Sequence, residues 1–310
     1  ISEFEISENK PTFIIAEIGN NHNGCLELAY KLVDNAVSSG ADCAKFQMRS
    51  KNLYSTKNSE DLGTEYTLDL LSRFQLENND LFKVFDYCKE EGILPLCTPF
   101  DLESLSQLEN YGMSAYKIAS ADITNHILLK EICKTGKPLI CSTGMATESE
   151  ISDSVELLKK NGANFALLHC NSTYPAPFKD INLSYLSKLK KIGENCPIGY
   201  SGHERGISVP VAAVSLGARI IEKHFTLDKS MEGNDHKVSL LPHELKNMVN
   251  YIREVEQAIG NNGSRIISQG EMMNREVLAK SLIANKSIKK GEIILKEHIE
   301  IRSPGNGIQP

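Results

Sequence analysis

Eight short apolar runs, each closed by a polar residue and followed by a helix-like stretch, constrain the fold of this chain more than any other feature. The runs cover residues 13–16, 42–46, 93–97, 115–119, 138–141, 165–169, 197–200 and 219–223. Strands that alternate with helices at this spacing predict a parallel sheet. Eight such units within about 250 residues predict an α/β fold of the (β/α)₈ (TIM) barrel type. A doubly wound open sheet is the second choice, because no Gly-x-Gly-x-x-Gly pattern follows the first run.

The segments between the runs carry helix signals. Residues 26–39 repeat apolar side chains at helical spacing and are followed by a glycine. Thr147 and Glu150 have the spacing of a capping box, which predicts that a helix over residues 151–161 begins there. Residues 241–259 form an amphipathic stretch with a proline near its start and a glycine after its end, the usual asymmetry of helix termini.

The pattern changes from residue 261 onward, where short apolar runs predict irregular β structure. The predicted strands are 281–284, 288–295 and 298–301, with turns at 289–291 and 304–307. We therefore expect a barrel domain over 1–262, a linker over 263–278 and a small β domain over 279–310. The small domain is expected to be incomplete, or to rely on other surfaces, since the chain stops at Pro310 before it could close a core.

Composition limits the class of protein. No apolar run approaches the ~20 residues that span a bilayer, and the N-terminus lacks a signal-peptide pattern, so we expect a cytoplasmic protein without membrane contact. The net charge of −6 argues against a nucleic-acid partner. Eight cysteines without a Cys-x-x-Cys pair disfavour a disulfide framework, and Cys170, after His169, is the one thiol worth examining as a nucleophile.

Two histidines follow the last two predicted strands. His203 and His224 are expected to converge at the mouth of the barrel, because the carboxyl ends of neighbouring parallel strands lie side by side. Glu204, Glu222 and Asp235 are near in sequence and could accept from the second imidazole nitrogens. Two neutral nitrogen ligands with water and substrate oxygens suit octahedral Mn²⁺ or Mg²⁺ better than tetrahedral Zn²⁺.

Two lysines interrupt apolar strands. Lys45 and Lys117 would be desolvated inside a barrel unless they meet an anion. One interpretation is an internal salt bridge with Glu17 or Glu222; another is binding of phosphate and carboxylate groups, and a Schiff-base lysine ranks lower. Glu17 itself ends the first strand, where carboxylates usually serve as ligands or as acid–base groups.

Hydroxyl side chains stand at five strand ends. They belong to Thr98, Ser120, Ser142, Ser172 and Ser201. Each alone is explained as a helix N-cap, whereas the set, with the free N–H groups of helix starts, favours phosphate binding. The sequence therefore predicts a metal-assisted enzyme that acts on a phosphorylated, anionic substrate.

Taken together, these residues resemble the sialic acid synthase family, the phosphoenolpyruvate-dependent nonulosonate synthases. The matching motifs, in family order, are AEIGxNHxG (16–24), KFQ (45–47), CTPFD (97–101), YKIAS (116–120), STGM (142–145), HCxSxYP (169–175), GYSGH (199–203), EKHFT (222–226) and GxDH (233–236). The resemblance implies condensation of phosphoenolpyruvate with an N-acylated amino sugar such as N-acetylmannosamine. The products would be a nine-carbon 2-keto acid and phosphate.

The resemblance also implies roles for individual residues. His203 and His224 would hold Mn²⁺, with Mg²⁺ or Co²⁺ as alternatives, and Glu17 and Glu222 would handle a water molecule and its protons. The groups that would bind phosphoenolpyruvate are Lys45, Lys117, Ser120, Ser142, Ser172 and Ser201. The other predicted substrate contacts are Gln47, Thr98, Asp122, Tyr174 and Asp235, of which Gln47, Tyr174 and Asp235 would contact the sugar.

The tail resembles the first half of the family's antifreeze-like (SAF) domain. That resemblance implies a homodimer in which this domain reaches over the partner's barrel and supplies an arginine to the sugar's N-acyl group. Arg302 is the nearest candidate, although the family pattern places arginine directly before Pro-Gly, where Ser303 stands here.

Several functions remain open. N-acetylneuraminate synthase ranks first and legionaminic acid synthase, which uses 2,4-diacetamido-2,4,6-trideoxymannose, ranks second; the GYSGH spelling disfavours the pseudaminic acid branch by resemblance. A sister synthase for a phosphorylated sugar would need further basic residues. From a different class, the chain could be a catalytically silent barrel that serves as a binding scaffold, which has no reason to keep a metal site.

Overall fold

The computed structural model describes residues 1–50, 73–260 and 263–310. This part of the chain divides into two compact units, Ile1–Ile259 and Gly260–Pro310. Among its helices, none has the length and apolar character that crossing a membrane requires.

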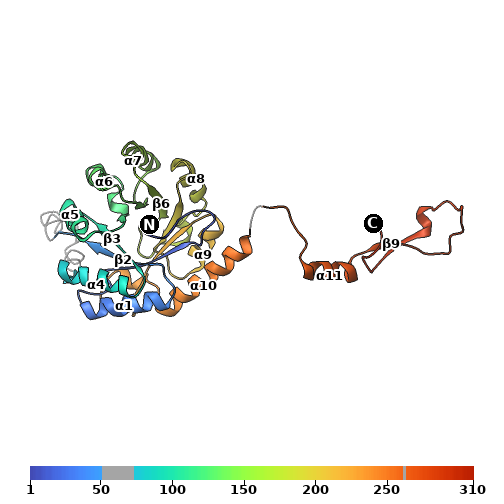
Figure 1. Cartoon of the computed structure of the whole chain (residues 1–310), viewed down its shortest axis with the longest axis horizontal. Helices are drawn as coiled ribbons and strands as arrows, with labels where there is room; N and C mark the ends of the chain where they lie inside the picture. The colour runs from blue at the N-terminus through green and yellow to red at the C-terminus, as the bar shows by residue number, and fades with distance from the viewer. Residues whose placement is uncertain (51–72, 261–262) are drawn as a thin grey trace. The chain divides into compact units, whose positions relative to one another are not determined.

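The first unit is a closed barrel of parallel strands, which confirms the predicted fold class (Figure 1). In chain order the strands are β1 (Phe13–Gly19), β2 (Cys43–Met48), β3 (Leu94–Pro99), β4 (Tyr116–Ile118), β5 (Leu139–Ser142), β6 (Phe165–Cys170), β7 (Ile198–Gly202) and β8 (Ile220–His224). Each of the eight predicted runs coincides with one of them. The barrel closes where β1 pairs with β8, so that strands from opposite ends of the domain share one hydrogen-bonded seam.

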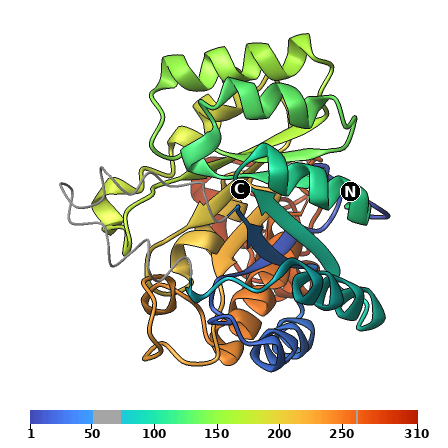
Figure 2. The ribbon, with the colours of Figure 1, turned by 90° about the vertical axis from the view of Figure 1, so that its left-hand side faces the viewer.

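Helices surround the strands on the outside. They are α1 (Leu26–Ser38), α4 (Asn78–Glu90), α5 (Leu102–Tyr111), α6 (His126–Cys133), α7 (Glu148–Lys160), α8 (Tyr185–Ile192), α9 (Ser208–Ser215) and α10 (Pro242–Ile259). Figure 2 shows green helices α6 and α7 on one side of the strands and the blue helix α1 on the opposite side. The capping box predicted at Thr147 and Glu150 forms at the start of α7.

Alternate residues along each strand belong to two separate apolar clusters. Ile14 and Ala16 of β1 join the large cluster that contacts the helices, whereas Phe13 and Ile15 join a smaller cluster that fills the barrel. This alternation follows from the two-residue period of a strand. It has a direct consequence for function, because the next residue of β1 on the inner face is Glu17.

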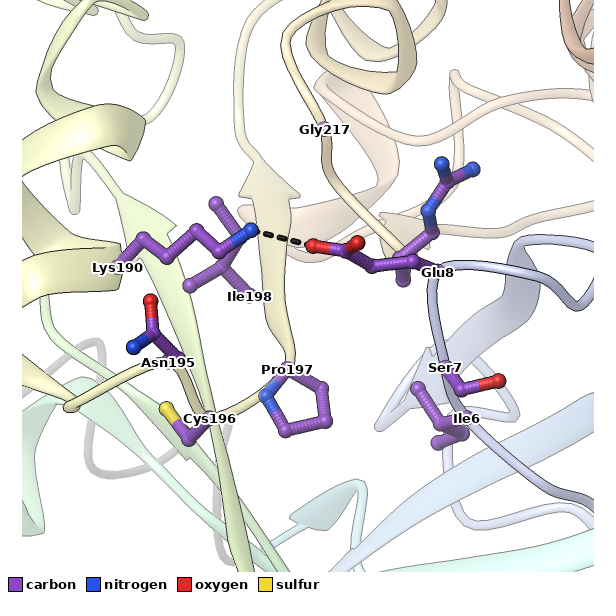
Figure 3. Close-up of a pocket in the computed structure, with 10 residues that line it drawn as sticks. Ile6, Ser7, Glu8, Lys190, Asn195, Cys196, Pro197, Ile198 and Gly217 are labelled. Carbon is purple, nitrogen blue, oxygen red and sulfur yellow. Dashed lines mark hydrogen bonds and ion pairs between the residues drawn. The ribbon is translucent and has the colours of Figure 1, made fainter. Parts of the chain in front are cut away.

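The N-terminal segment closes the floor of the barrel, at the opposite end of the strands from their carboxyl ends. Ile1, Phe4 and Ile6 pack against the inner cluster, and the Phe4 ring meets the edge of Phe13 at a centroid distance of 5.2 Å. A pocket of about 210 Å³ lies beside this segment, where Glu8 and Lys190 form an ion pair (Figure 3). This pocket is far from the strand ends that carry the predicted chemistry.

The second unit contains α11 (Gln269–Leu278) and an antiparallel pair of strands, β9 (Ser281–Ala284) and β10 (Ile299–Arg302). Helix α11, which begins with a capping box at Ser268, occupies most of the predicted linker. The prediction of a strand over 288–295 is wrong. A turn at Gly291, whose φ of 86° is left-handed, interrupts this segment, and the apolar Ile293 beyond it is 77% exposed.

Candidate active site

Six polar side chains from six different strands form one buried layer above the inner apolar cluster. This polar layer consists of Glu17, Lys45, Lys117, Ser142, Ser201 and Glu222. None of these residues is more than 6% exposed. Register brings them together, because Glu17 lies opposite Lys45 across β1 and β2, and Ser201 lies opposite Glu222 across β7 and β8.

Salt bridges and hydrogen bonds connect the layer. Lys45 Nζ lies 2.7 Å from Glu17 Oε2 and 3.8 Å from Glu222 Oε2. Lys117 Nζ lies 3.7 Å from Glu222 Oε1 and donates to Ser142 Oγ at 2.6 Å. Ser201 Oγ donates to Glu222 Oε1 at 3.0 Å. The internal salt bridges that the sequence offered as one interpretation of the lysines are therefore formed, and Glu222 bridges the two lysines.

The two lysines differ in their tendency to lose a proton. Burial pushes the pKa of Lys45 down, but the Glu17 and Glu222 carboxylates push it up further, so that this pKa lies above its ordinary value. For Lys117 burial outweighs the attraction of Glu222, and its pKa is lowered. Burial alone would raise the pKa of Glu222, yet Lys117 and Lys45 lower it. Lys117 is therefore the ammonium group that gives up a proton more readily.

Two further polar side chains contact the layer. Gln47 Nε2 donates to Glu17 Oε1 at 2.7 Å, and Lys45 Nζ donates to Thr98 Oγ1 at 3.4 Å, so both of these residues lie beside the polar layer. Sequence reasoning missed Arg49, which is buried, hydrogen-bonds Gln47 and lies over the Phe100 ring. The available signal was its position, two residues after Gln47 and directly after the end of β2.

The imidazoles of His203 and His224 lie next to each other, with ring centroids 5.4 Å apart. Asn171 O lies 2.7 Å from His203 Nδ1, which we assign as the protonated nitrogen. The lone pair of Nε2 then accepts from the Tyr174 hydroxyl at 3.0 Å. Burial raises the pKa of the Cys170 thiol, but the His203 imidazole, whose Nδ1 lies 3.6 Å from the sulfur, lowers it further, so that this pKa lies below its ordinary value.

His224 Nδ1 is a buried atom without a hydrogen-bond partner in the part of the chain that the structure describes. The nearest charged group is Asp235 Oδ2 at 3.8 Å. Burial lowers the pKa of His224, which favours the neutral imidazole that a metal ion requires. An unpaired, neutral ring nitrogen beside a second imidazole fits a divalent cation.

The described residues hold no group of three or more His, Cys, Asp and Glu side chains arranged for a metal. A cation held by His203 and His224 would therefore take its remaining ligands from water and substrate. That arrangement is typical of Mn²⁺ and Mg²⁺, which keep several water ligands, and not of a structural Zn²⁺ site.

A loop after β5 carries a hydroxyl cradle. The Gly144 N–H donates to Ser120 Oγ at 3.2 Å. A Cβ atom at Gly144 would collide with Ser172 Oγ and would lie 2.8 Å from Ser120 Oγ. Ser120 and Ser172 thus come together as predicted, while Gly144 itself was not predicted; its place in the STGM motif was the available signal.

Three predicted residues have other partners. Asp122 accepts from Asn125 Nδ2 at 3.0 Å within its own turn. Arg302 belongs to the second unit, where it pairs with Glu300 at 2.9 Å. Glu204, offered as an acceptor for an imidazole, instead contacts Lys223 and the hydroxyl of Tyr200.

Comparisons with known proteins agree with this architecture. The NeuB family model matches residues 32–264. The N,N'-diacetyllegionaminic acid synthase of Campylobacter jejuni is 44% identical, over 96% of this chain and 92% of that protein. The human N-acetylneuraminate-9-phosphate synthase is 35% identical, over 94% and 83%.

Among solved structures, an N-acetylneuraminic acid synthetase from Leptospira borgpetersenii superposes with a TM-score of 0.80 at 35% identity. The match covers 88% of this chain and 93% of that one. With the family model, the curated relatives and the barrel all in agreement, the chain belongs to the NeuB family of nonulosonic acid synthases.

Proposed function

We propose that this chain condenses phosphoenolpyruvate with an N-acylated mannosamine-type sugar to give a nonulosonic acid and phosphate. The observation that carries this proposal is the polar layer, in which two buried lysines meet two buried carboxylates beside a pair of imidazoles. A substrate with a phosphate and a carboxylate offers two anionic groups that can bind the two ammonium groups. The free-energy cost of burying these ammonium groups is already offset in the folded chain by the two carboxylates.

The side chains of the layer have separate roles in this proposal. Lys45 and Lys117 bind the phosphate and carboxylate of phosphoenolpyruvate, and the Ser142 hydroxyl, which Lys117 already orients, adds a donor. The hydroxyls of Ser120 and Ser172, together with the Gly144 N–H, supply donors on the neighbouring loop. These groups hold the substrate in one orientation in a site largely closed to water.

Bond formation follows from that orientation. Carbon 3 of phosphoenolpyruvate attacks the aldehyde carbon of the open-chain sugar, and water adds to carbon 2. Glu222 or Glu17 takes the proton that this water loses, and the alkoxide formed from the aldehyde oxygen takes up a proton to become a hydroxyl. The tetrahedral intermediate then releases phosphate by breaking its bond between carbon 2 and oxygen, which leaves the 2-keto acid.

His203 and His224 are the residues that would hold the divalent cation, with Mn²⁺ first and Mg²⁺ or Co²⁺ as alternatives. When bound, this cation would polarise the aldehyde oxygen as a Lewis acid. Gln47, Tyr174 and Asp235 line the same region and contact the sugar in this proposal.

Two acceptor sugars compete. The sequence ranked N-acetylmannosamine first, whereas the relatives support the 2,4-diacetamido-2,4,6-trideoxymannose of legionaminic acid synthesis more strongly. Identity to the Campylobacter jejuni and Legionella pneumophila N,N'-diacetyllegionaminic acid synthases is 44% and 38%, against 35% to the human N-acetylneuraminate-9-phosphate synthase. We therefore place the diacetamido sugar first.

Phosphate release tests the proposal directly. The protein is incubated with phosphoenolpyruvate, Mn²⁺ and one of three sugars: the diacetamido sugar, N-acetylmannosamine or its 6-phosphate. We expect release that requires both sugar and metal, that EDTA abolishes and that is fastest with the diacetamido sugar. His203→Ala should fold normally and release no phosphate, because it lacks one proposed metal ligand. No release with any sugar would favour a silent barrel, and full activity of His203→Ala would refute the metal assignment.

A further inference from the structure

Among the described residues, the most deeply buried ion pair outside the polar layer joins Lys223 and Glu204. Their side chains are 0% and 1% exposed, and Lys223 Nζ lies 3.1 Å from Glu204 Oε1. Lys223 also donates to the main-chain oxygen of Glu204 at 2.5 Å. The second carboxylate oxygen accepts from the Tyr200 hydroxyl at 2.6 Å. Three contacts thus fix Glu204, side chain and main chain together, to its neighbouring strands.

The pair occupies a particular place in the chain. Glu204 directly follows His203, and Lys223 directly precedes His224. Lys223 lies opposite Gly202 in the register of β7 and β8. Because side chains alternate along a strand, Lys223 lies on the outer face of the barrel wall, behind the face that carries Glu222 and His224. The ion pair therefore connects the two strand ends that hold the imidazoles.

The glycine at position 202 makes room for this arrangement. A Cβ atom there would lie 2.8 Å from both carboxylate oxygens of Glu204 and 2.7 Å from the Tyr200 ring. The φ of Gly202 is not in the left-handed region, so backbone freedom is not the reason for a glycine here. Glycine is needed because any larger residue at position 202 would collide with the Glu204 carboxylate. This collision accounts for the glycine in the Ser-Gly-His-Glu sequence.

Stability alone is a weak explanation for such a pair. Removing two charges from water is expensive, and well-packed apolar residues often stabilise a fold as well as a buried ion pair does. Directional contacts do provide a defined geometry. His224 needs that geometry, since its Nδ1 has no hydrogen-bond partner in the described chain and its ring is placed by the backbone of β8 and by packing against Tyr174 and His203.

We propose that the Glu204–Lys223 ion pair is a positioning brace that sets the spacing of the His203 and His224 imidazoles and thereby the affinity for the divalent cation. This inference rests on the proposed function, because it assumes that the two imidazoles hold the cation. Neither Glu204 nor Lys223 touches substrate in this proposal; both act through the backbone of the adjacent histidine.

Binding of Mn²⁺ to folded variants tests the brace. In Glu204→Gln and in the neutral double variant Glu204→Gln/Lys223→Met, we expect the Kd for Mn²⁺, measured by titration calorimetry, to rise about tenfold, the lower end of the loss that follows removal of a group hydrogen-bonded to a metal ligand. The KM for phosphoenolpyruvate at saturating Mn²⁺ should stay near that of the wild type, because Lys45 and Lys117 are unaffected. Lys223→Arg should retain part of the affinity.

Lys137→Met is the matched control, because it removes the partner of Glu109 in an ion pair far from the histidines in sequence. It should leave the Kd for Mn²⁺ unchanged. The single variant Glu204→Gln leaves the buried Lys223 ammonium group without a carboxylate, which favours misfolding. The double variant removes both charges and so avoids this problem. If the double variant folds, as judged by circular dichroism, and its Kd for Mn²⁺ is within twofold of the wild type, the brace is refuted.

A second readout separates failure of the brace from failure of the proposed function. Histidine-labelled protein contains eight imidazoles, whose nitrogen NMR signals can be followed without metal. We expect Glu204→Gln to shift the signals of His203 and His224 and to leave those of His126 and His243 in place. Wild-type protein that binds no Mn²⁺ would contradict the proposed cation, whereas unchanged His203 and His224 signals would overturn the brace itself.

Discussion

Buried titratable residues in this chain differ in whether they have a partner of opposite charge. Glu222 lies between two lysines, which lower its pKa in spite of burial. His22 is also almost fully buried, but its Nδ1 accepts only from the Gly24 N–H, at 3.1 Å. Burial therefore lowers the pKa of His22 to about 4. A buried charge is stable in this protein where the strand register supplies a counter-charge, and within residues 1–50, 73–260 and 263–310 His22 has none.

The pKa of His22 predicts a loss of stability in mild acid. Between the ordinary value of 6.5 and about 4, the unfolded chain binds a proton that the folded chain does not, so the free energy of unfolding falls as the pH falls through this range. The full effect is about 3 kcal/mol. Urea unfolding at pH 7, 5.5 and 4.5 should show this slope in the wild type and a flatter one in His22→Gln. Equal slopes in the two proteins would contradict the assignment.

Strand ends and the salt bridges of the polar layer were predictable from the sequence, whereas the partner of Glu204 and the course of the tail were not. Apolar runs fix where a strand ends, and parallel strands bring their ends together, so that Glu17, Lys45, Lys117 and Glu222 could be placed in one site. The partner of Glu204 depends on which face of β8 carries Lys223, and sequence proximity to histidine suggested a different role. In the second unit, residues 288–295 have the apolar composition of a strand. However, they pair with neither β9 nor β10, the two strands of the described part of this unit.

The loop after β5 carries a prediction of its own. Gly144→Ala should raise the KM for phosphoenolpyruvate about tenfold or more, since the new methyl group displaces the Ser120 and Ser172 hydroxyls from the cradle. Gly270→Ala is the control, because a Cβ atom there meets open space and its φ is not left-handed. Steady-state kinetics and thermal unfolding of both variants check this. An unchanged KM in a folded Gly144→Ala protein would mean that the cradle does not bind the substrate.

The whole molecule consists of two units, of which the barrel carries every described contact of the candidate site. The resemblance of the tail to an antifreeze-like domain, and the role of Arg302 in a partner's site, stay predictions. In the second unit, apolar side chains such as Ile293, Ile294 and Ile308 are exposed.

Mixing two inactive variants tests the predicted homodimer with shared sites. Arg302→Ala and His203→Ala are each expected to lose activity. If the tail of one subunit contributes to the site of its partner's barrel, a heterodimer of the two variants has one site with both residues intact. Half of the dimers in a 1:1 mixture are heterodimers after subunit exchange, so the mixture should regain about a quarter of the wild-type activity. Activity that does not return, or an Arg302→Ala protein with normal kinetics, would exclude a shared site that uses this arginine.

The seam between β1 and β8 also governs when the enzyme can first work during its synthesis. Glu17 lies in the first strand of the barrel, and its neighbours Glu222 and His224 in the last strand follow it by 205 and 207 residues in the chain. At ordinary translation rates the first strand waits roughly 10 to 40 s for the last. Until then Lys45 and Lys117 lack the carboxylate that bridges them. Closure of the barrel and completion of the charged site therefore occur together, once β8 has been made.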